Sequence, residues 1–208
     1  LFGVGSTQAA IALRYWLEET NTPGTIRLYG TPAEEGGSGK VYIARDGYFD
    51  DVDIVLHWHP DDNNRAFFSS SNGNKSAKFK FKGISSHAAG APQNGRSALD
   101  GVEAMNMMVN MLREHMDEEA RIHYVITKGG LAPNVVPEEA EVYYYVRHPN
   151  VDGVRNLFNR VVKAAEGAAK GTETKMVFEV MHGNYPLMPN ETLSVVINEE
   201  LKKLGGIS

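Results

Sequence analysis

The sequence predicts an α/β protein in which a smaller domain is inserted into a larger one. Three observations support this prediction. Residues 6–58 alternate helical and strand-like patterns, which is typical of an α/β layer. Small polar residues dominate 69–76, as they do at domain boundaries. From residue 76 to 181 the predicted elements follow the order β-α-β-β-α-β.

The larger domain begins with a helix and an alternating strand. Residues 6–20 predict a helix, since Ser6 or Thr7 can cap its start and apolar side chains recur at helical spacing after it. In residues 25–30, TIRLYG, apolar and polar side chains alternate, which predicts a strand.

A short helix at 38–46 and a second strand at 51–58 complete this layer. The second strand, DVDIVLHW, is nearly continuous in apolar residues, as expected of a parallel strand that is buried on both faces. We assign 1–73 and 186–208 to the larger domain, with Asn190 capping a last helix.

The inserted domain is assigned to 74–185. Its first strand, AKFKFKG, alternates alanine or phenylalanine with lysine, so one face is solvated and the other is buried. The remaining predicted elements are a helix at 97–115, strands at 120–128 and 139–147, a helix at 151–169 and a strand at 173–181. This order predicts a ferredoxin-like sandwich, an antiparallel sheet with two helices on one face.

Composition excludes several classes of protein. The 208 residues are 42% hydrophobic and 23% charged, which suits a globular protein with a real core. A net charge of −5 with mixed signs argues against a broad nucleic-acid surface. With no cysteine, this stretch has no disulfide and no thiolate metal site, and no apolar run approaches the ~20 residues of a membrane span. The sequence opens on LFGVG and closes on LKKLGGIS, which predicts truncation at both ends.

Two adjacent glutamates, Glu34 and Glu35, follow the strand at 25–30 in a glycine-rich turn. Ligand sites of open α/β sheets lie at this end of the strands. One carboxylate can bind a metal while the other takes a proton from metal-bound water. The alternative is a helix N-terminus carrying acids that favour the helix dipole.

Two histidines flank Trp58 at the end of the second strand. Alternation directs His57 and His59 to one face. His59 lies nearer the edge where ligands bind, so we favour it as a metal ligand and treat His57 as supporting or structural. The alternative for either histidine is a satisfied core side chain.

Three further candidates lie in the inserted domain. His87 stands in an uncrowded loop, GISSHAAGAP, and the alternative is an ordinary exposed loop histidine. Asn134 lies between two prolines, and Arg147 ends a strand. Arginine is suited to a bidentate grip on a carboxylate. The alternative for Arg147 is a surface ion pair with a glutamate at 138, 139 or 141.

Taken together, the segments GTPAEEGGSGK, DVDIVLHWHP, GISSHAAGAPQNGRSALDGVEAMN and ARIHYVITKGGLAPNVVPEEAEVYYYVR resemble the dinuclear-metal aminoacylase/carboxypeptidase amidohydrolases. The resemblance covers essentially the whole chain. It implies part of a zinc-peptidase-like α/β catalytic domain with an inserted ferredoxin-like lid and dimerisation domain. It also implies hydrolysis of the amide of an N-acyl or N-aroyl amino acid, with p-aminobenzoyl-glutamate as the leading substrate.

The resemblance implies a role for each candidate residue. Glu34 would be the general base, and Glu35 and His59 would bind metal. His87 would reach from the lid to the scissile carbonyl, in the active site of the other copy in a dimer. Asn134 and Arg147 would hold the substrate carboxylate.

The resemblance also implies the setting of the reaction. Two divalent ions, Zn or Mn, would be bound in a cytoplasmic homodimer that forms through the lid, with a second related protein chain as a further partner and no role for nucleic acid or membrane. Members of the family carry ligand motifs upstream and downstream that this sequence lacks, so it holds two of five expected ligands. We therefore expect the isolated chain to be an inactive fragment. Alternatives are a dipeptidase or N-acyl-amino-acid deacylase of the same family, and a non-catalytic dimerisation module.

Overall fold

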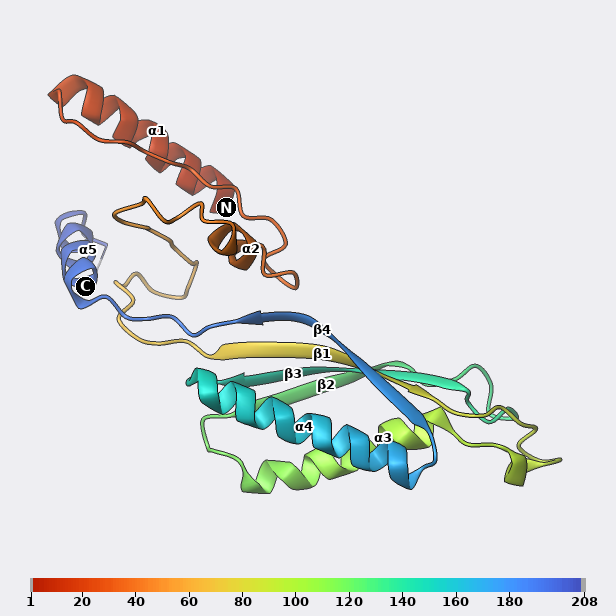
Figure 1. The fold of residues 1–208 in the computed structure, drawn as a ribbon. Helices are drawn as coiled ribbons and strands as arrows, with labels where there is room; N and C mark the ends of the chain where they lie inside the picture. The colour runs from red at the N-terminus through yellow and green to blue at the C-terminus, as the bar shows by residue number, and fades with distance from the viewer. Residues whose placement is uncertain (1, 207–208) are drawn as a thin grey trace. The chain divides into compact units, whose positions relative to one another are not determined.

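The computed structural model describes residues 2–206 and divides into two compact units (Figure 1). The first unit consists of Leu1–Ala66 and Thr192–Ser208, and the second is Phe67–Glu191. The functional domain limits predicted at 74 and 185 stay a prediction.

The second unit contains a four-stranded antiparallel sheet with strand order β2-β3-β1-β4. Two helices cover one face of the sheet and leave the other face open (Figure 1). The elements are β1 (Gly73–Lys82), α3 (Ala98–Leu112), β2 (Arg121–Lys128), β3 (Glu139–His148), α4 (Val151–Gly171) and β4 (Lys175–Asn184). The predicted β-α-β-β-α-β order is confirmed, and so is the mixed α/β class. Short 3₁₀ turns occur at Pro92–Asn94 and Arg113–His115.

Both helices of this unit begin at side-chain caps that the sequence encodes. Ser97 Oγ accepts a hydrogen bond from the backbone N–H of Asp100 at 3.1 Å. Asn150 Oδ1 accepts one from the N–H of Asp152 at 2.7 Å. Such caps satisfy donors that the first helical turn leaves unpaired.

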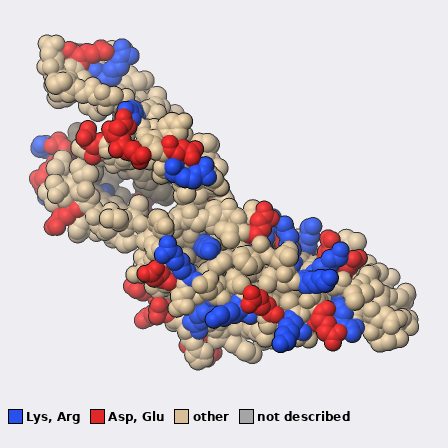
Figure 2. All heavy atoms as spheres, viewed as in Figure 1, with Lys and Arg blue, Asp and Glu red and all other residues tan. Residues whose placement is uncertain are grey.

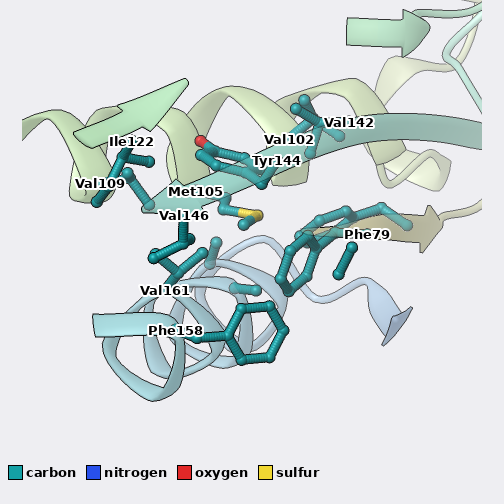
Figure 3. Packing of buried hydrophobic residues seen from close by; sticks show 14 of the residues in the cluster. Phe79, Val102, Met105, Val109, Ile122, Val142, Tyr144, Val146, Phe158 and Val161 are labelled. Carbon is teal, nitrogen blue, oxygen red and sulfur yellow. The ribbon is translucent and has the colours of Figure 1, made fainter. Parts of the chain in front are cut away.

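The core lies between the sheet and the two helices (Figure 3). The alternation predicted for β1 is confirmed, because Phe79 and Phe81 are buried while Lys80 and Lys82 are exposed. Residues from β2, β3, α3 and α4 complete the cluster, and its labelled members include Val102, Met105, Val109, Ile122, Val142, Tyr144, Val146, Phe158 and Val161. Every element therefore buries one face against its neighbours.

Charged side chains of both signs are interspersed on the face shown in Figure 2. Several of them form ion pairs across the sheet. Lys80 pairs with Glu179 at 2.9 Å, and Lys78 approaches Glu141 at 3.6 Å. The lysines of β1 are thus largely matched by acids of the adjacent strands.

The first unit contains α1 (Phe2–Thr20) and α2 (Gly39–Arg45), and most of α5 (Glu191–Lys203) belongs to it. The helices predicted at 6–20, at 38–46 and after Asn190 are confirmed. Of the described helices, none combines the length and the apolar character that crossing a bilayer requires.

The strands predicted at 25–30 and 51–58 are wrong. Both segments lack strand structure, and the side chains of Ile54, Val55 and Leu56 are 55%, 59% and 69% exposed. A strand exists only where a neighbour supplies backbone hydrogen bonds. Here the two regions meet through side chains, since Arg27 grips Asp51 with two hydrogen bonds of 2.5 and 2.6 Å.

Candidate active-site residues

Glu34 and Glu35 lie in a tight turn at residues 34–37, and both are exposed. The N–H of Gly37 donates to the carbonyl of Ala33 at 3.0 Å, which closes the turn. A Cβ at Gly39 would overlap the carbonyl oxygen of Pro32, so the close approach of the backbone requires glycine. The turn presents both carboxylates to solvent just before α2.

His57 and Glu34 are close enough to interact electrostatically. Partial desolvation lowers the pKa of His57, the charges of Lys40 and His59 lower it further, and Glu34 opposes them. The first unit therefore brings one glutamate of the pair and both histidines into one neighbourhood.

His59 has a defined tautomer when its ring is neutral. Its Nδ1 lies 2.7 Å from the carbonyl oxygen of Pro60, and because a carbonyl only accepts, Nδ1 carries the proton. The ring also contacts Phe2 edge-on, with centroids 5.5 Å apart. Nε2 then keeps its lone pair, which is the arrangement usual for a metal-binding histidine.

A complete metal site is not formed by the residues that the structure describes. Across 2–206, no group of three or more histidine, aspartate or glutamate side chains is arranged to hold an ion. A catalytic zinc site needs three protein ligands, so Glu35 and His59 do not suffice alone. The assignment of these two residues as ligands stays a prediction.

His87 and Asn134 are brought together by the second unit. His87 pairs with Val135 in an isolated antiparallel bridge, and the N–H of Ala88 donates to the carbonyl of Asn134 at 3.0 Å. These two loops extend the pairing of β1 and β3 beyond the end of the sheet.

The loop also orients the His87 ring. Nδ1 accepts hydrogen bonds from the N–H groups of Ala89 at 3.2 Å and Gly90 at 2.9 Å. In the neutral ring Nε2 therefore carries the proton and can donate to a carbonyl oxygen. A Cβ at Gly90 would lie 3.3 Å from the ring, so glycine there allows the turn to close on the imidazole.

Arg147 lies at the opposite end of β3 from this loop. Glu139 and Arg147 are eight residues apart on one strand, or roughly 27 Å at the usual rise per residue. Arg147 is exposed, and its guanidinium carbon lies 5.4 Å from the centre of the Tyr145 ring. Within one copy, Arg147 and the His87 loop do not share a small ligand.

The glutamates considered as ion-pair partners of Arg147 have other partners. Glu138 approaches Lys82 at 4.0 Å, and Glu141 accepts a hydrogen bond from Thr127 at 2.7 Å. The charges of Lys78 and Lys80, with the Thr127 hydrogen bond, lower the pKa of Glu141 although burial opposes them. Glutamate pairing therefore does not account for the place of Arg147.

Sequence reasoning missed the polar group around Arg147. His182 of β4 has its Nε2 2.9 Å from the hydroxyl of Tyr145. No pattern in the sequence signals this contact, because it joins two strands that are not consecutive in the chain and are separated by β1 in the sheet.

Comparisons with known proteins agree with this architecture. The family model described as the peptidase dimerisation domain of M20 peptidases matches residues 69–173. One of the two kinds of chain in the p-aminobenzoyl-glutamate hydrolase of Escherichia coli K12 is 45% identical over 99% of this chain. The Xaa-Arg dipeptidase of Mus musculus is 34% identical over 95% of it. This chain covers only 43% and 46% of these relatives' own lengths.

A solved structure supports the fold. The aminobenzoyl-glutamate utilization protein from Klebsiella pneumoniae matches with a TM-score of 0.74 at 22% identity, covering 98% of this chain and 54% of the other. The sequence-based resemblance and the predicted lid architecture are both confirmed. The chain belongs to the M20 peptidase family, carries its peptidase dimerisation domain, and is similar over nearly its whole length to a chain of p-aminobenzoyl-glutamate hydrolase.

Proposed function

We propose that this chain is part of a metal-dependent amidohydrolase that cleaves the amide of an N-acyl or N-aroyl amino acid, with p-aminobenzoyl-glutamate as the leading substrate. The observation that carries the proposal is the 45% identity to a chain of p-aminobenzoyl-glutamate hydrolase, which runs through both units. The orientation of His87 supports it, because a held Nε2–H donor is what a polarised carbonyl needs.

The residues of this chain divide the work. Glu34 acts as general base and then returns the proton to the leaving amine. Glu35 and His59 supply two ligands of a divalent ion, Zn or Mn, with other ligands that residues 2–206 do not provide. The ion, when bound, makes a water acidic enough to act at neutral pH. Asn134 and Arg147 bind the substrate, with Arg147 on its free carboxylate.

Two copies of the lid domain, assigned to 74–185, are needed for one site. The separation of roughly 27 Å along β3 keeps Arg147 away from the His87 loop in one copy. His87 of a second copy can complete the site. The edge strand β2 and the exposed side chains of Met107 and Met111 on α3, 60% and 62% exposed, offer a surface for a second copy or a related chain.

The test is metal analysis and p-aminobenzoyl-glutamate hydrolysis with the intact gene product, assayed as a cytoplasmic enzyme would be, at neutral pH. We expect hydrolysis that chelators abolish and that Zn or Mn restores. Glu34→Gln is expected to lose turnover and keep its metal, whereas Glu35→Gln is expected to lose both. Metal loss in the Glu34 variant would reverse the two assignments.

Mixed dimers test the shared site. His87→Ala and Glu34→Gln chains, each inactive, are expected to regain part of the activity when combined, because one of the two sites then has an intact Glu34 and an intact His87 from the other copy. No recovery in dimers shown to be mixed would place His87 in the site of its own chain.

A second candidate is a dipeptidase or deacylase of the same family, which the 34% identity to Xaa-Arg dipeptidase favours. Assays with dipeptides and other N-acyl amino acids separate the two. A faster rate on dipeptides than on p-aminobenzoyl-glutamate would select the dipeptidase. An intact product that binds no metal and dimerises would instead be a non-catalytic dimerisation module.

A further inference from the structure

The open face of the sheet carries a connected set of polar contacts that ends at Arg147. Tyr145 precedes Arg147 by two residues on β3, so both side chains project from the same face. The guanidinium carbon lies 5.4 Å from the centre of the tyrosine ring, which is a cation–π distance. The ring thus serves as a platform for the arginine.

The platform itself is held by its neighbours. The Tyr145 hydroxyl lies 2.9 Å from His182 Nε2 and accepts a weak hydrogen bond of 3.5 Å from the hydroxyl of Tyr143. The rings of Tyr145 and His182 also meet edge-on, with centroids 5.2 Å apart. His182 is only 8% exposed, so the pair is packed as well as hydrogen-bonded.

A β-bulge places His182 on this face. β1 and β4 shift register between Ser76 and Ala77, and Ser76 stands opposite His182 instead of Met181. Without the extra residue, strict alternation would turn His182 toward the helices. Bulges redirect side chains in this way, often beside functional sites. Ser76 Oγ also donates to the His182 carbonyl at 3.4 Å.

Arg147 and His182 are electrostatically coupled. Burial lowers the pKa of His182, and the charge of Arg147 lowers it further. The imidazole is therefore neutral at pH 7, and it can bond to the tyrosine hydroxyl without repelling the arginine. The contact supports the guanidinium and does not compete with it.

We propose that Tyr145 and His182 are positioning residues that hold the Arg147 guanidinium ready for the free carboxylate of the substrate. The role of Arg147 rests on the proposed function. A long side chain that is already stacked on a fixed ring loses less freedom when it binds, so the binding of the carboxylate improves. The pair touches Arg147 and not the reacting amide.

The first test uses steady-state kinetics of the intact gene product on p-aminobenzoyl-glutamate. Tyr145→Leu is expected to raise KM about two- to fivefold, the usual worth of an exposed cation–π contact, with kcat nearly unchanged. Tyr145→Phe, which keeps the ring, and His182→Gln, which keeps a hydrogen-bonding group, are expected to have smaller effects. The matched control is Tyr124→Leu, the same substitution on the helix-covered face.

A substrate analogue separates positioning from general damage. On the analogue whose α-carboxylate is replaced by a carboxamide, Tyr145→Leu is expected to match the wild type, because the arginine has no anion to grip. An equal rise in KM on both compounds, or no rise on either, overturns the proposal. A rise of the same size in Tyr124→Leu does so as well.

A second measurement does not depend on activity. In the NMR spectrum, the Nε–H signal of Arg147, assigned through Arg147→Lys, is expected to be shifted by the tyrosine ring and to lose this shift in Tyr145→Leu. An unshifted wild-type signal refutes the positioning even if hydrolysis is normal. A product that hydrolyses no acyl-amino acid refutes the proposed function, while the NMR result still decides the stacking.

Discussion

Replacing Tyr144 by phenylalanine removes one buried hydroxyl and tests the polar contact inside the core. The side chain is fully buried, and its hydroxyl donates to Asn106 Oδ1 at 2.5 Å. Burial raises the pKa of the Tyr144 hydroxyl well above its usual range, so it remains a donor at all ordinary pH values. Asn106 is itself 6% exposed, so water cannot easily replace the lost donor.

The magnitude follows from the unsatisfied acceptor. Tyr144→Phe keeps the ring and its packing, so the loss is the hydrogen bond together with the stranded Asn106 oxygen. Leaving a buried acceptor unpaired costs about 1–3 kcal/mol, and we expect the free energy of unfolding to fall by that amount. Replacing both partners by apolar groups is often nearly neutral. Tyr144→Phe with Asn106→Leu is therefore expected to recover most of the loss.

Urea unfolding of the wild type, the two single variants and the double variant measures this coupling. The control is Tyr124→Phe, whose ring stacks on Tyr144 with centroids 4.9 Å apart but is 37% exposed. Its change is expected to stay within about 0.5 kcal/mol, as for most surface substitutions. A loss below that value for Tyr144→Phe, or a double variant no more stable than the singles, would refute the reasoning.

Three other substitutions probe the second unit. Gly153→Ala drives a Cβ into the His148 ring and is expected to cost about 1–3 kcal/mol in thermal or urea unfolding, whereas Gly171→Ala, with open space around it, is expected to be harmless. Asn150→Ala removes the α4 cap and is expected to cost about 1 kcal/mol, measured the same way. Because the folded-state pKa of His182 lies below its usual 6.5, the unfolded chain binds the proton more readily. Stability is expected to fall as pH drops below about 6.5, and His182→Gln is expected to lessen this slope in urea titrations at several pH values.

The prediction of the second unit succeeded because its elements carry their own local signals. The alternation around Phe79 and the caps at Ser97 and Asn150 each specify an element from neighbouring residues. The four strands then pair with one another, so local pattern and tertiary packing agree. The strands predicted at 25–30 and 51–58 had the right pattern but no pairing neighbour among the described residues.

The candidate site was predicted as a set of residue types, and its grouping was not. Sequence alone did not show that the carbonyl of Asn134 bonds the loop of His87, or that Arg147 lies at the far end of the same strand. The contact of Tyr145 with His182 was missed because a one-residue bulge controls which face His182 occupies. Register is a property of the paired strands, and a single chain pattern does not contain it.

By itself, the sequence determined which segments are helices, which strands carry one buried face, and which residues have side chains able to bind, orient or move a proton. These follow from local periodicity and side-chain chemistry, which depend on near neighbours along the chain. Only the tertiary structure decided which of those residues meet, that the His87 loop and Arg147 lie apart, and which face His182 shares. The reason is that strand order, register and bulges arise from hydrogen bonds between segments far apart in the sequence.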